Sequence, residues 1–315
     1  DDNVKRGKSS QTGDVDKALS EAAAKIDGTY SVPEISHCCL EAHGMVAEWN
    51  GDKLRVWSST QATQNVAQDL AMEFKIPGTN VKCITHHMGG GFGSIFNAGV
   101  EGKACAHLAK KAGKPVRLML DRRLEHSAGI RPSAMARVQA GVNKEGQLTA
   151  FRAEQKGSPG IGSSANFPLP YVYESIPNVD TRLDSVRCNF HETRAYRAPG
   201  HPQACYVMES VMDDLAAKLG MDPVELRRKN LPEGMIGEIY NKELDIGMKM
   251  FGWKEKYHPP GKGPAKGPKR RGVGVACHKW GGAGVPIDQM LCEINPDGSI
   301  LMQSSTQDLG TANRT

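Results

Sequence analysis

Residues 45–60, MVAEWNGDKLRVWSST, contain two runs of alternating apolar and polar residues that meet at Asn50-Gly51. Alternation with a period of two is the pattern of a strand with one buried face. Asn-Gly is favoured in the two-residue turn between antiparallel strands. The pattern predicts a β-hairpin, and a chain that contains it must form at least one sheet.

Further patterns indicate helices among several short strands. Apolar spacing and end signals predict helices at 14–28, 63–75, 97–115, 203–219 and 222–232. Strands are predicted at 81–88, 115–120, 136–142, 147–155, 271–280, 287–294 and 299–307. Sheets with prominent hairpins and a few helices indicate an α+β (mixed α/β) fold.

Length and composition are those of a soluble globular protein. The chain has 315 residues, 39% hydrophobic and 24% charged residues, and a net charge of +5. Two domains and a sizeable core are therefore expected. Eight cysteines without a CxxC pair favour reduced, buried thiols over a disulfide framework. No apolar run is long enough for a membrane span, and we expect no signal peptide.

Residues 258–272, HPPGKGPAKGPKRRG, form the strongest shift in composition along the chain. Proline, glycine and lysine in this density are typical of a linker. A nucleic-acid-binding tail would have a similar charge, but interleaved aromatic residues are missing. The segment is therefore predicted to be a solvated linker, and no nucleic-acid partner is expected.

Residues 86–102, HHMGGGFGSIFNAGVEG, place consecutive glycines between a predicted strand and a predicted helix. The spacing matches neither a P-loop nor a dinucleotide fingerprint. A strand, a glycine turn and a helix start can still bind an anion through backbone N–H groups and the helix dipole. A tight turn packed against another backbone explains the glycines equally well.

Three other polar segments stand at the ends of predicted elements. Residues 192–203, ETRAYRAPGHPQ, place Arg194 and Arg197 in a loop stiffened by proline and glycine, which suits an anionic or polar ligand. Residues 58–64 and 304–315 each carry a glutamine after a predicted strand, and its amide can both donate and accept. Together the four segments would suit a large cofactor rich in oxygen and nitrogen.

On these motifs the sequence resembles the molybdenum-binding large subunit of the xanthine dehydrogenase and aldehyde oxidase family. MGGGFGS resembles the family's glycine loop, WSSTQ its first glutamine loop, RAYRAPGHPQ its arginine loop and STQDLGT a second pterin-contacting loop. MESVMDDLAAKLGMDPVELRRKNL is similar to the helical end of the first cofactor domain. The likeness runs from about Asp14 to the end, nearest to bacterial xanthine dehydrogenase-like or isoquinoline oxidoreductase-like subunits.

The resemblance implies roles for individual residues. Gln61, Phe92 and Arg197 are the expected catalytic residues, with Gln61 hydrogen-bonding an oxo group on molybdenum and Arg197 beside the active site. The expected cofactor-binding residues are Gly89, Gly90, Gly91, Phe92, Gly93, Arg197, Ala198, Gln307, Gly310 and Thr311. Phe92 could instead be a core anchor that faces the cofactor only through its backbone. No protein ligand to a metal is expected, and an ion pair that braces the loop is the expected role of Arg194.

Departures from the family pattern narrow the expected reaction. Purine-oxidising members have a glutamate where this chain has Phe96, and carbon monoxide-oxidising members have a cysteine where it has Ala198. The resemblance therefore implies a hydroxylase that oxidises an aldehyde or an aromatic N-heterocycle with oxygen derived from water. The family's catalytic glutamate lies downstream of the residues present. A non-catalytic cofactor-binding or assembly scaffold is the alternative.

The resemblance also implies domains and partners. We expect a polar tail or fragment edge at 1–13, a first molybdopterin-binding domain at 14–232, a connection with the linker at 233–271, and the start of a second such domain at 272–315. The cofactor is expected to be molybdenum-molybdopterin, with cytosine dinucleotide as a candidate form. An iron–sulfur subunit with [2Fe–2S] and a subunit with FAD are the expected partners. The expected location is cytoplasmic, with periplasmic export of the full protein left open.

Overall fold

The computed structural model describes residues 3–161, 164–189, 192–280, 290–304 and 307–310. Contacts within the chain divide it into two compact units. The first, here the six-stranded unit, comprises Asp1–Glu34, Pro132–Asn189 and Ala198–Gly281. The second, here the four-stranded unit, comprises Ile35–Arg131, Phe190–Arg197 and Gly282–Thr315. The predicted division into domains at 14–232, 233–271 and 272–315 follows family domains and stays a prediction.

The six-stranded unit is built on one sheet with the strand order β1-β12-β11-β10-β3, in which β2 also pairs with β12. Its strands are β1 (Val4–Lys5), β2 (Ser9–Thr12), β3 (Ala24–Val32), β10 (Ser133–Val142), β11 (Leu148–Ser158) and β12 (Asn178–Val186). The strands predicted at 136–142 and 147–155 are confirmed as β10 and β11, which pair antiparallel with each other. β12 pairs with β11 in parallel.

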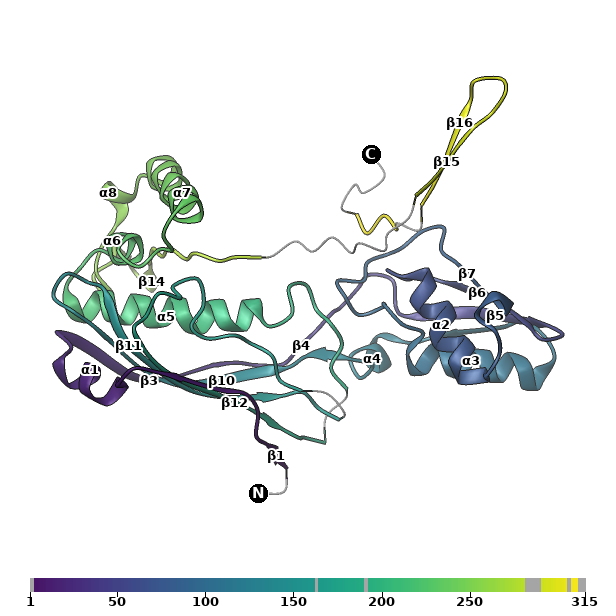
Figure 1. The fold of residues 1–315 in the computed structure, drawn as a ribbon, viewed down its shortest axis with the longest axis horizontal. Helices are drawn as coiled ribbons and strands as arrows, with labels where there is room; N and C mark the ends of the chain where they lie inside the picture. The colour runs from purple at the N-terminus through teal and green to yellow at the C-terminus, as the bar shows by residue number, and fades with distance from the viewer. Residues whose placement is uncertain (1–2, 162–163, 190–191, 281–289, 305–306, 311–315) are drawn as a thin grey trace. The chain divides into compact units, whose positions relative to one another are not determined.

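A long helix, α5 (His201–Leu219), lies along one face of this sheet (Figure 1). Its apolar side chains recur every three or four residues, as predicted, and Val207, Val211 and Leu215 are fully buried. Asp222 caps the following helix α6 (Pro223–Arg228) by accepting a hydrogen bond from the Val224 N–H at 2.7 Å. The sheet and these helices form the larger hydrophobic core.

The first predicted helix is too long. Asp14 is the N-cap, as expected, but α1 ends at Glu21 and spans only Val15–Glu21. Residues Ala24–Val32 instead form β3, which pairs antiparallel with β10 from Ala24–Val142 to Val32–Ala134. Ala24 and Lys25 favour a helix locally, and the pairing with β10 overrides that preference.

The four-stranded unit contains a sheet with the strand order β7-β6-β5-β8. Its strands are β5 (Gly44–Asn50), β6 (Lys53–Ser58), β7 (Val81–Ile84) and β8 (Val116–Met119). β5 and β6 form the predicted hairpin about Asn50-Gly51, and β6 pairs with β7 in parallel. Helices α2 (Thr63–Phe74) and α3 (Gly99–Ala112) pack on this sheet and bury Val56, Leu70 and Cys105 in a second core (Figure 1).

Short elements complete this unit as the structure describes it. They are β4 (Ile35–Ser36) paired with β9 (Ile130–Arg131), the 3₁₀ turn η1 (Gly78–Asn80), α4 (Arg122–Glu125), and the hairpin β15 (Met290–Ile294) with β16 (Ile300–Ser304). The last two strands were predicted. The strand predicted at 271–280 is wrong, because the residues that the structure describes there have no strand pairing.

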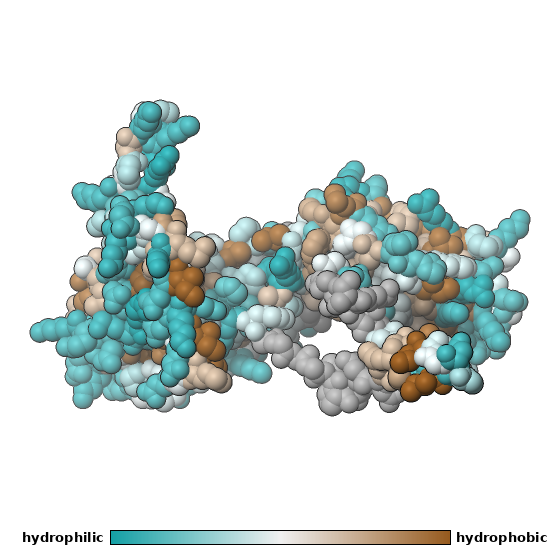
Figure 2. All heavy atoms as spheres, turned by 90° about the horizontal axis from the view of Figure 1, so that it is seen from above, coloured by the Kyte–Doolittle hydropathy of each residue, from teal (hydrophilic) through white to brown (hydrophobic). Residues whose placement is uncertain are grey.

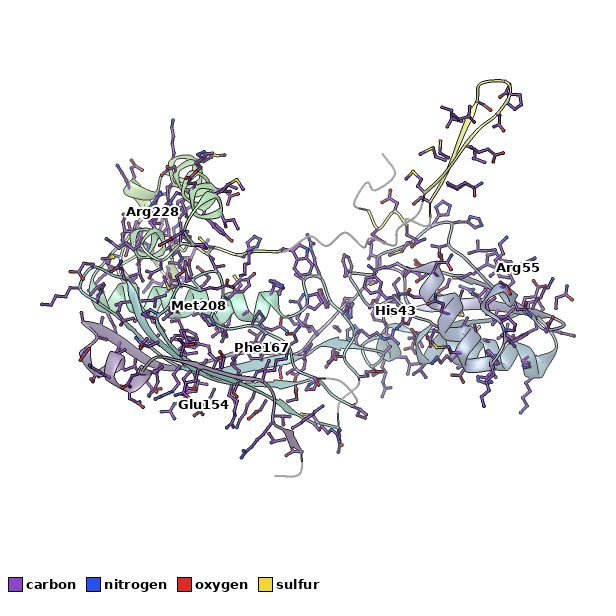
Figure 3. The ribbon with its side chains drawn as sticks, in the orientation of Figure 1. His43, Arg55, Glu154, Phe167, Met208 and Arg228 are labelled. Carbon is purple, nitrogen blue, oxygen red and sulfur yellow. The ribbon has the colours of Figure 1, made fainter. Side chains whose placement is uncertain are left out.

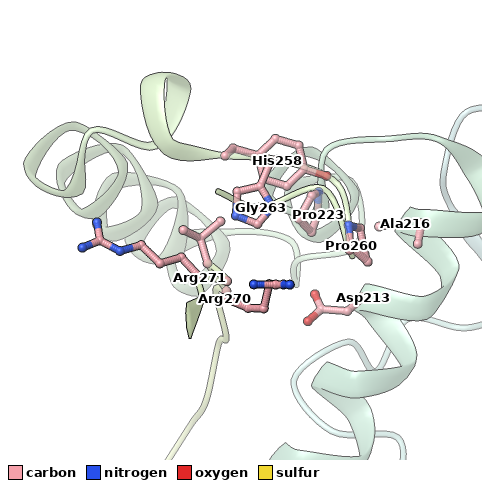
Figure 4. Close-up of a pocket in the computed structure, with 14 residues that line it drawn as sticks. Asp213, Ala216, Pro223, His258, Pro260, Gly263, Arg270 and Arg271 are labelled. Atoms are coloured by element: carbon pink, nitrogen blue, oxygen red, sulfur yellow. The ribbon is translucent and has the colours of Figure 1, made fainter. Parts of the chain in front are cut away.

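The segment at 258–272 is exposed, as predicted, but it also has local structure. Two residue pairs, Ala265–Lys266 (β13) and Lys269–Arg270 (β14), form a small antiparallel ladder. A cavity of about 280 Å³ lies between this segment and helices α5 and α6. Figure 4 shows Asp213 of α5 and Arg270 pointing toward one another across it. The expected connection from 233 also contains two helices that the sequence patterns did not predict, α7 (Met235–Phe251) and α8 (Trp253–Lys256).

On the face shown in Figure 2, hydrophilic side chains predominate and apolar ones are interspersed among them. Several exposed apolar residues lie on α7, among them Met235, Ile236 and Met250. Among the described residues, none of the helices has the length and apolar character that crossing a membrane requires. All eight cysteines are free thiols, which agrees with the expectation of reduced cysteines.

Candidate functional site

The first glutamine loop and the glycine loop meet in the four-stranded unit. The backbone N–H of Gly93 donates to Oε1 of Gln61 at 2.6 Å. The backbone N–H of Gln61 donates to the carbonyl of Ile95 at 3.0 Å, and the buried Thr60 hydroxyl donates to the same carbonyl at 2.7 Å. These bonds fix the carboxamide of Gln61, because its oxygen is engaged by the loop. Its Nε2 group is then a donor that no described residue uses.

The arginine loop packs against the same turn. The backbone N–H of Arg197 donates to the carbonyl of Phe92 at 2.7 Å. Gly93 has φ +105°, and a Cβ added to it would lie 2.6 Å from the carbonyl oxygen of Ala195. Only glycine fits both this backbone conformation and this close approach. Segments around residues 61, 93 and 197 therefore converge at Gly93.

The other glycines also lie against the protein's own atoms. A Cβ on Gly89 would lie 2.3 Å from Cβ of Glu41, and one on Gly91 would lie 2.5 Å from Oε1 of Gln61. The N–H of Gly89 donates to the Glu41 carboxylate at 2.6 Å. Tight packing, one of the two explanations open from the sequence, thus accounts for glycine at 89, 91 and 93. Contact of this loop with a cofactor stays a prediction.

At the start of the helix after the glycine loop, one backbone N–H is used within the protein. Helix α3 begins only at Gly99, because residues 92–95 form a turn after the glycines. The N–H of Ala98 at its start donates to the Asp69 carboxylate at 3.2 Å. This N–H is therefore engaged within the protein, and binding of an anion by the glycine loop and this helix stays a prediction.

Phe92 and Arg197 present exposed side chains beside this turn. Phe92 is 45% exposed and adopts φ +51°, which is uncommon outside glycine, so the alternative of a core anchor is wrong. The Arg197 side chain is exposed and forms no ion pair or hydrogen bond with any residue that the structure describes. Its guanidinium is therefore a cation available to a ligand. Ala198, next in the chain, has φ +59°.

Arg194 has the bracing role that the sequence predicts. Its guanidinium donates to both carboxylate oxygens of Glu101 at 2.9 Å, with side chains only 17% and 6% exposed. It also donates to the carbonyl of Ser94 at 3.4 Å. The ion pair ties the arginine loop to the first turn of α3 and to the segment that follows Gly93.

Two further residues support the arginine loop and were not identified from the sequence. Arg131 donates to the carbonyls of Tyr196 and Arg197 at 3.1 and 2.7 Å, and its guanidinium lies over the Tyr196 ring. His37 stacks on that ring and hydrogen-bonds the carbonyl of Ala195 at 2.7 Å. Burial lowers the pKa of His37, which favours the neutral imidazole. No local pattern marks either residue, because both lie far along the chain from the loop.

A cavity of about 970 Å³ opens beside the glycine and arginine loops within this unit. Gly93, Phe96, Arg194 and Ala195 contribute to its wall, together with apolar side chains such as Leu118. Phe96 is 40% exposed. Its wall combines apolar side chains with charged ones such as Asp69, Lys103 and Glu192, and Gln61, Phe92 and Arg197 are not among its lining residues.

The second glutamine loop is described only in part. Nε2 of Gln307 donates to the Thr63 hydroxyl at 3.3 Å, close in sequence to the first glutamine loop. Gly310 has φ +82°. Thr311 lies outside the residues that the structure describes.

The family model of the molybdopterin cofactor-binding domain matches residues 1–231. The chain belongs to this family. It is 31% identical over 320 residues to the aldehyde oxidoreductase molybdenum-binding subunit PaoC of Escherichia coli O157:H7, covering 96% of this chain and 43% of that protein. It is 29% identical over 340 residues to the putative xanthine dehydrogenase molybdenum-binding subunit XdhA of Escherichia coli K12, covering 98% and 44%. The chain thus spans less than half the length of these curated relatives.

A solved structure shares the fold of this family member. Quinoline 2-oxidoreductase from Pseudomonas putida 86 superimposes with a TM-score of 0.74 at 21% identity, covering 98% of this chain and 44% of that one. The fold therefore confirms the predicted mixed α and β architecture of molybdenum-cofactor-binding type.

The residues present fit a molybdopterin cofactor on chemical grounds. Such a cofactor presents many oxygen and nitrogen acceptors, and the site offers the Gln61 amide and the Arg197 guanidinium as donors without a described partner. Most glycine positions of the loop contribute close packing, which holds those donors in place.

Proposed function

We propose that this chain is the cofactor-binding part of a molybdenum hydroxylase that oxidises an aldehyde or an aromatic N-heterocycle with water-derived oxygen. The convergence at Gly93 carries the proposal. Gln61 and the Ala195–Tyr196 backbone contact Gly93 itself, and Arg197 hydrogen-bonds the neighbouring Phe92. Three segments that are far apart in the sequence thus meet at one place, and two of them carry the free donors of Gln61 and Arg197.

The chain's own residues would bind and orient the cofactor. Gln61 would donate from Nε2 to an oxygen on molybdenum, since Gly93 already occupies its carbonyl oxygen. Arg197 would place its positive charge beside the reacting group, and its backbone bond to Phe92 fixes the loop that carries it. Gly89, Gly90, Gly91, Phe92, Gly93 and Ala198 would line the approach, and Gln307, Gly310 and Thr311 would contact the pterin. When bound, the cofactor supplies the two-electron oxidation.

The cavity beside the loops supports a substrate of modest polarity. Phe96 stands where a purine-oxidising site would need a carboxylate, and it lines this cavity together with other apolar side chains and several charged ones. Phenylalanine in place of that carboxylate favours an aldehyde or an aromatic N-heterocycle over xanthine. One relative's name includes aldehyde oxidoreductase, and that of another is nicotinate hydroxylase.

Electrons would leave through a [2Fe–2S] partner, with FAD on a further subunit. The support is that relatives of this chain are named as molybdenum-binding subunits, a name that implies other subunits. The cofactor would carry a cytosine dinucleotide, and the protein would act in the cytoplasm or be exported folded.

Dye-linked oxidation by the intact protein tests this function. Aldehydes and N-heterocycles are offered to the wild type, to Arg197→Met and to Arg55→Met, which removes an exposed arginine of β6 in the same unit. We expect Arg197→Met to lower turnover at least tenfold and Arg55→Met to match the wild type. Equal rates for the two variants would remove Arg197 from the mechanism. A molybdenum-loaded wild type without turnover on either class would favour the cofactor-binding scaffold instead.

A further inference from the structure

Three side chains with metal-ligating atoms are buried together behind the glycine loop. Cys39 is fully buried, and His43 and Glu125 are 5% and 4% exposed. One potential ligand atom from each lies within 4.8 Å of the others. All three belong to the four-stranded unit, where Cys39 and His43 precede β5 and Glu125 ends α4. The proposed oxidation of an organic substrate uses none of them.

The hydrogen bonds of His43 leave one ring nitrogen without a partner (His43 is labelled in Figure 3). Nε2 lies 2.8 Å from the Ser94 hydroxyl, which itself donates to the carbonyl of Gly91 at 2.7 Å. Because that donation uses the hydroxyl proton, His43 must donate from Nε2 to the Ser94 oxygen. Nδ1 then carries a lone pair, and it is buried without a hydrogen-bond partner among the described residues.

Glu125 also has one buried polar atom without a hydrogen-bond partner among the described residues. Its Oε2 accepts a hydrogen bond from Arg122 at 2.7 Å. Its Oε1 is buried and has no hydrogen-bond partner among the described residues. Buried polar atoms are nearly always satisfied in folded proteins, so two such atoms in one cluster indicate a missing partner that accepts electron pairs from both.

Burial acts on both acids of the cluster. Burial raises the pKa of the Cys39 thiol, and the nearby Glu125 carboxylate acts in the same direction. Burial likewise raises the pKa of Glu125, against the opposing charge of Arg122.

We propose that Cys39 Sγ, His43 Nδ1 and Glu125 Oε1 bind a zinc ion. A thiolate with an imidazole selects zinc over magnesium or calcium, which prefer oxygen ligands. Ligands of tetrahedral zinc lie about 2.0–2.3 Å from the ion and so roughly 3.5 Å from one another. Each side chain already offers one ligand atom within 4.8 Å of the other two, so small side-chain rotations would suffice to reach that spacing. A water molecule completes the fourth position.

Such an ion would support the proposed cofactor site from behind. A metal-bound histidine commonly donates its other N–H to an oxygen that fixes the ring, and Ser94 fills that role for His43. Ser94 also holds the Gly91 carbonyl through both its hydroxyl and its backbone N–H. The ion would therefore tie the segment from Cys39 to His43, helix α4 and the glycine loop into one rigid piece.

Cobalt titration of the purified, chelator-treated protein tests the site without reference to oxidation activity. The wild type is expected to bind stoichiometric Co²⁺ with a thiolate-to-cobalt charge-transfer band and the visible bands of tetrahedral cobalt, all abolished by stoichiometric Zn²⁺. Cys39→Ser should lose the charge-transfer band. Cys38→Ser, which changes the exposed neighbouring thiol, should keep it. Ser94→Ala should weaken zinc binding by about 10- to 100-fold.

Zinc should also raise the thermal unfolding midpoint of the wild type and of Cys38→Ser, but not that of Cys39→Ser. If Cys39→Ser does not fold, Glu125→Gln, which preserves volume, takes its place, and loss of stoichiometric zinc is expected. The proposal is overturned if the wild type binds no stoichiometric Co²⁺. It is equally overturned if the band survives in Cys39→Ser, if Cys38→Ser loses it as fully, or if Glu125→Gln binds zinc like the wild type.

Discussion

Removal of the Arg194 side chain should destabilise the four-stranded unit strongly. Arg194 and Glu101 form a two-pronged ion pair with both N–O distances at 2.9 Å, and Glu101 is nearly sealed from water. Arg194→Met retains an unbranched apolar stem but leaves the Glu101 carboxylate buried without its partner. An uncompensated buried charge is the costly result of breaking such a pair.

The expected magnitude follows from the burial of the two side chains. Removal of one member of a buried pair costs about 3–5 kcal/mol. Because the Arg194 side chain is 17% exposed, water can reach the vacated space, so we expect the lower end, about 3 kcal/mol. The Arg194→Met/Glu101→Gln double variant removes both charges and should be more stable than the sum of the single losses predicts, by about 2 kcal/mol.

Urea denaturation followed by tryptophan fluorescence measures these differences, since Trp49 and Trp57 lie in the same unit as the pair. The control pair is Arg55 with Glu48, separated by 3.9 Å on the exposed surface of the β5–β6 hairpin. Arg55→Met should cost less than about 1 kcal/mol.

A buried ion pair is refuted if Arg194→Met lowers the free energy of unfolding by no more than Arg55→Met does. It is also refuted if the losses of the Arg194 and Glu101 single variants simply add in the double variant. Either result would mean that the ion pair is solvated and does not brace the arginine loop.

Three further predictions follow from individual contacts. Gly93→Ala should lower the free energy of unfolding, measured by urea denaturation, by at least about 2 kcal/mol, because φ is +105° and the new Cβ would meet the Ala195 carbonyl. Gly78→Ala, with open space around it, should change that free energy by no more than about 1 kcal/mol. Asp222→Ala should lower the free energy of unfolding by about 2 kcal/mol, because the Asp222 carboxylate caps α6 and accepts a hydrogen bond from the buried Trp253 indole. A loss below about 0.5 kcal/mol would contradict the cap. Burial raises the pKa of Cys83 to about 12 from 9.0, so the thiol ionises in the unfolded chain before it ionises in the folded protein. The free energy of unfolding should therefore fall by about 1.4 kcal/mol per pH unit from about pH 9 toward 12. Cys83→Ala should lack this slope, and an unchanged slope would rule out Cys83 as its source.

Local patterns predicted those parts of the fold that are stabilised by near neighbours in sequence. The hairpin about Asn50-Gly51 is one example, because its turn and its alternation are written within one short stretch. The segment Ala24–Val32 is the opposite case, because its strand exists through pairing with β10, far along the chain. Helix α7 was missed because it follows Gly234 without a side-chain cap and leaves many apolar residues exposed.

In the candidate site, too, local motifs were predictable and contacts between distant segments were not. Its glycine, glutamine and arginine loops are contiguous motifs, so the sequence alone predicts them, and it also predicts the bracing role of Arg194. His37 and Arg131 escaped notice because each acts on a loop distant in the chain. The sequence also could not show that Glu41, Gln61 and the Ala195 backbone, themselves parts of the protein, account for most of the glycines.

The most direct test of the account is the molybdenum and pterin content of the intact protein, purified from its native source without denaturation. The account predicts stoichiometric molybdenum with an organic pterin in the wild type, and a clear loss of both in a Gln61→Ala variant that remains folded. An intact, folded wild type that contains neither molybdenum nor pterin would contradict it.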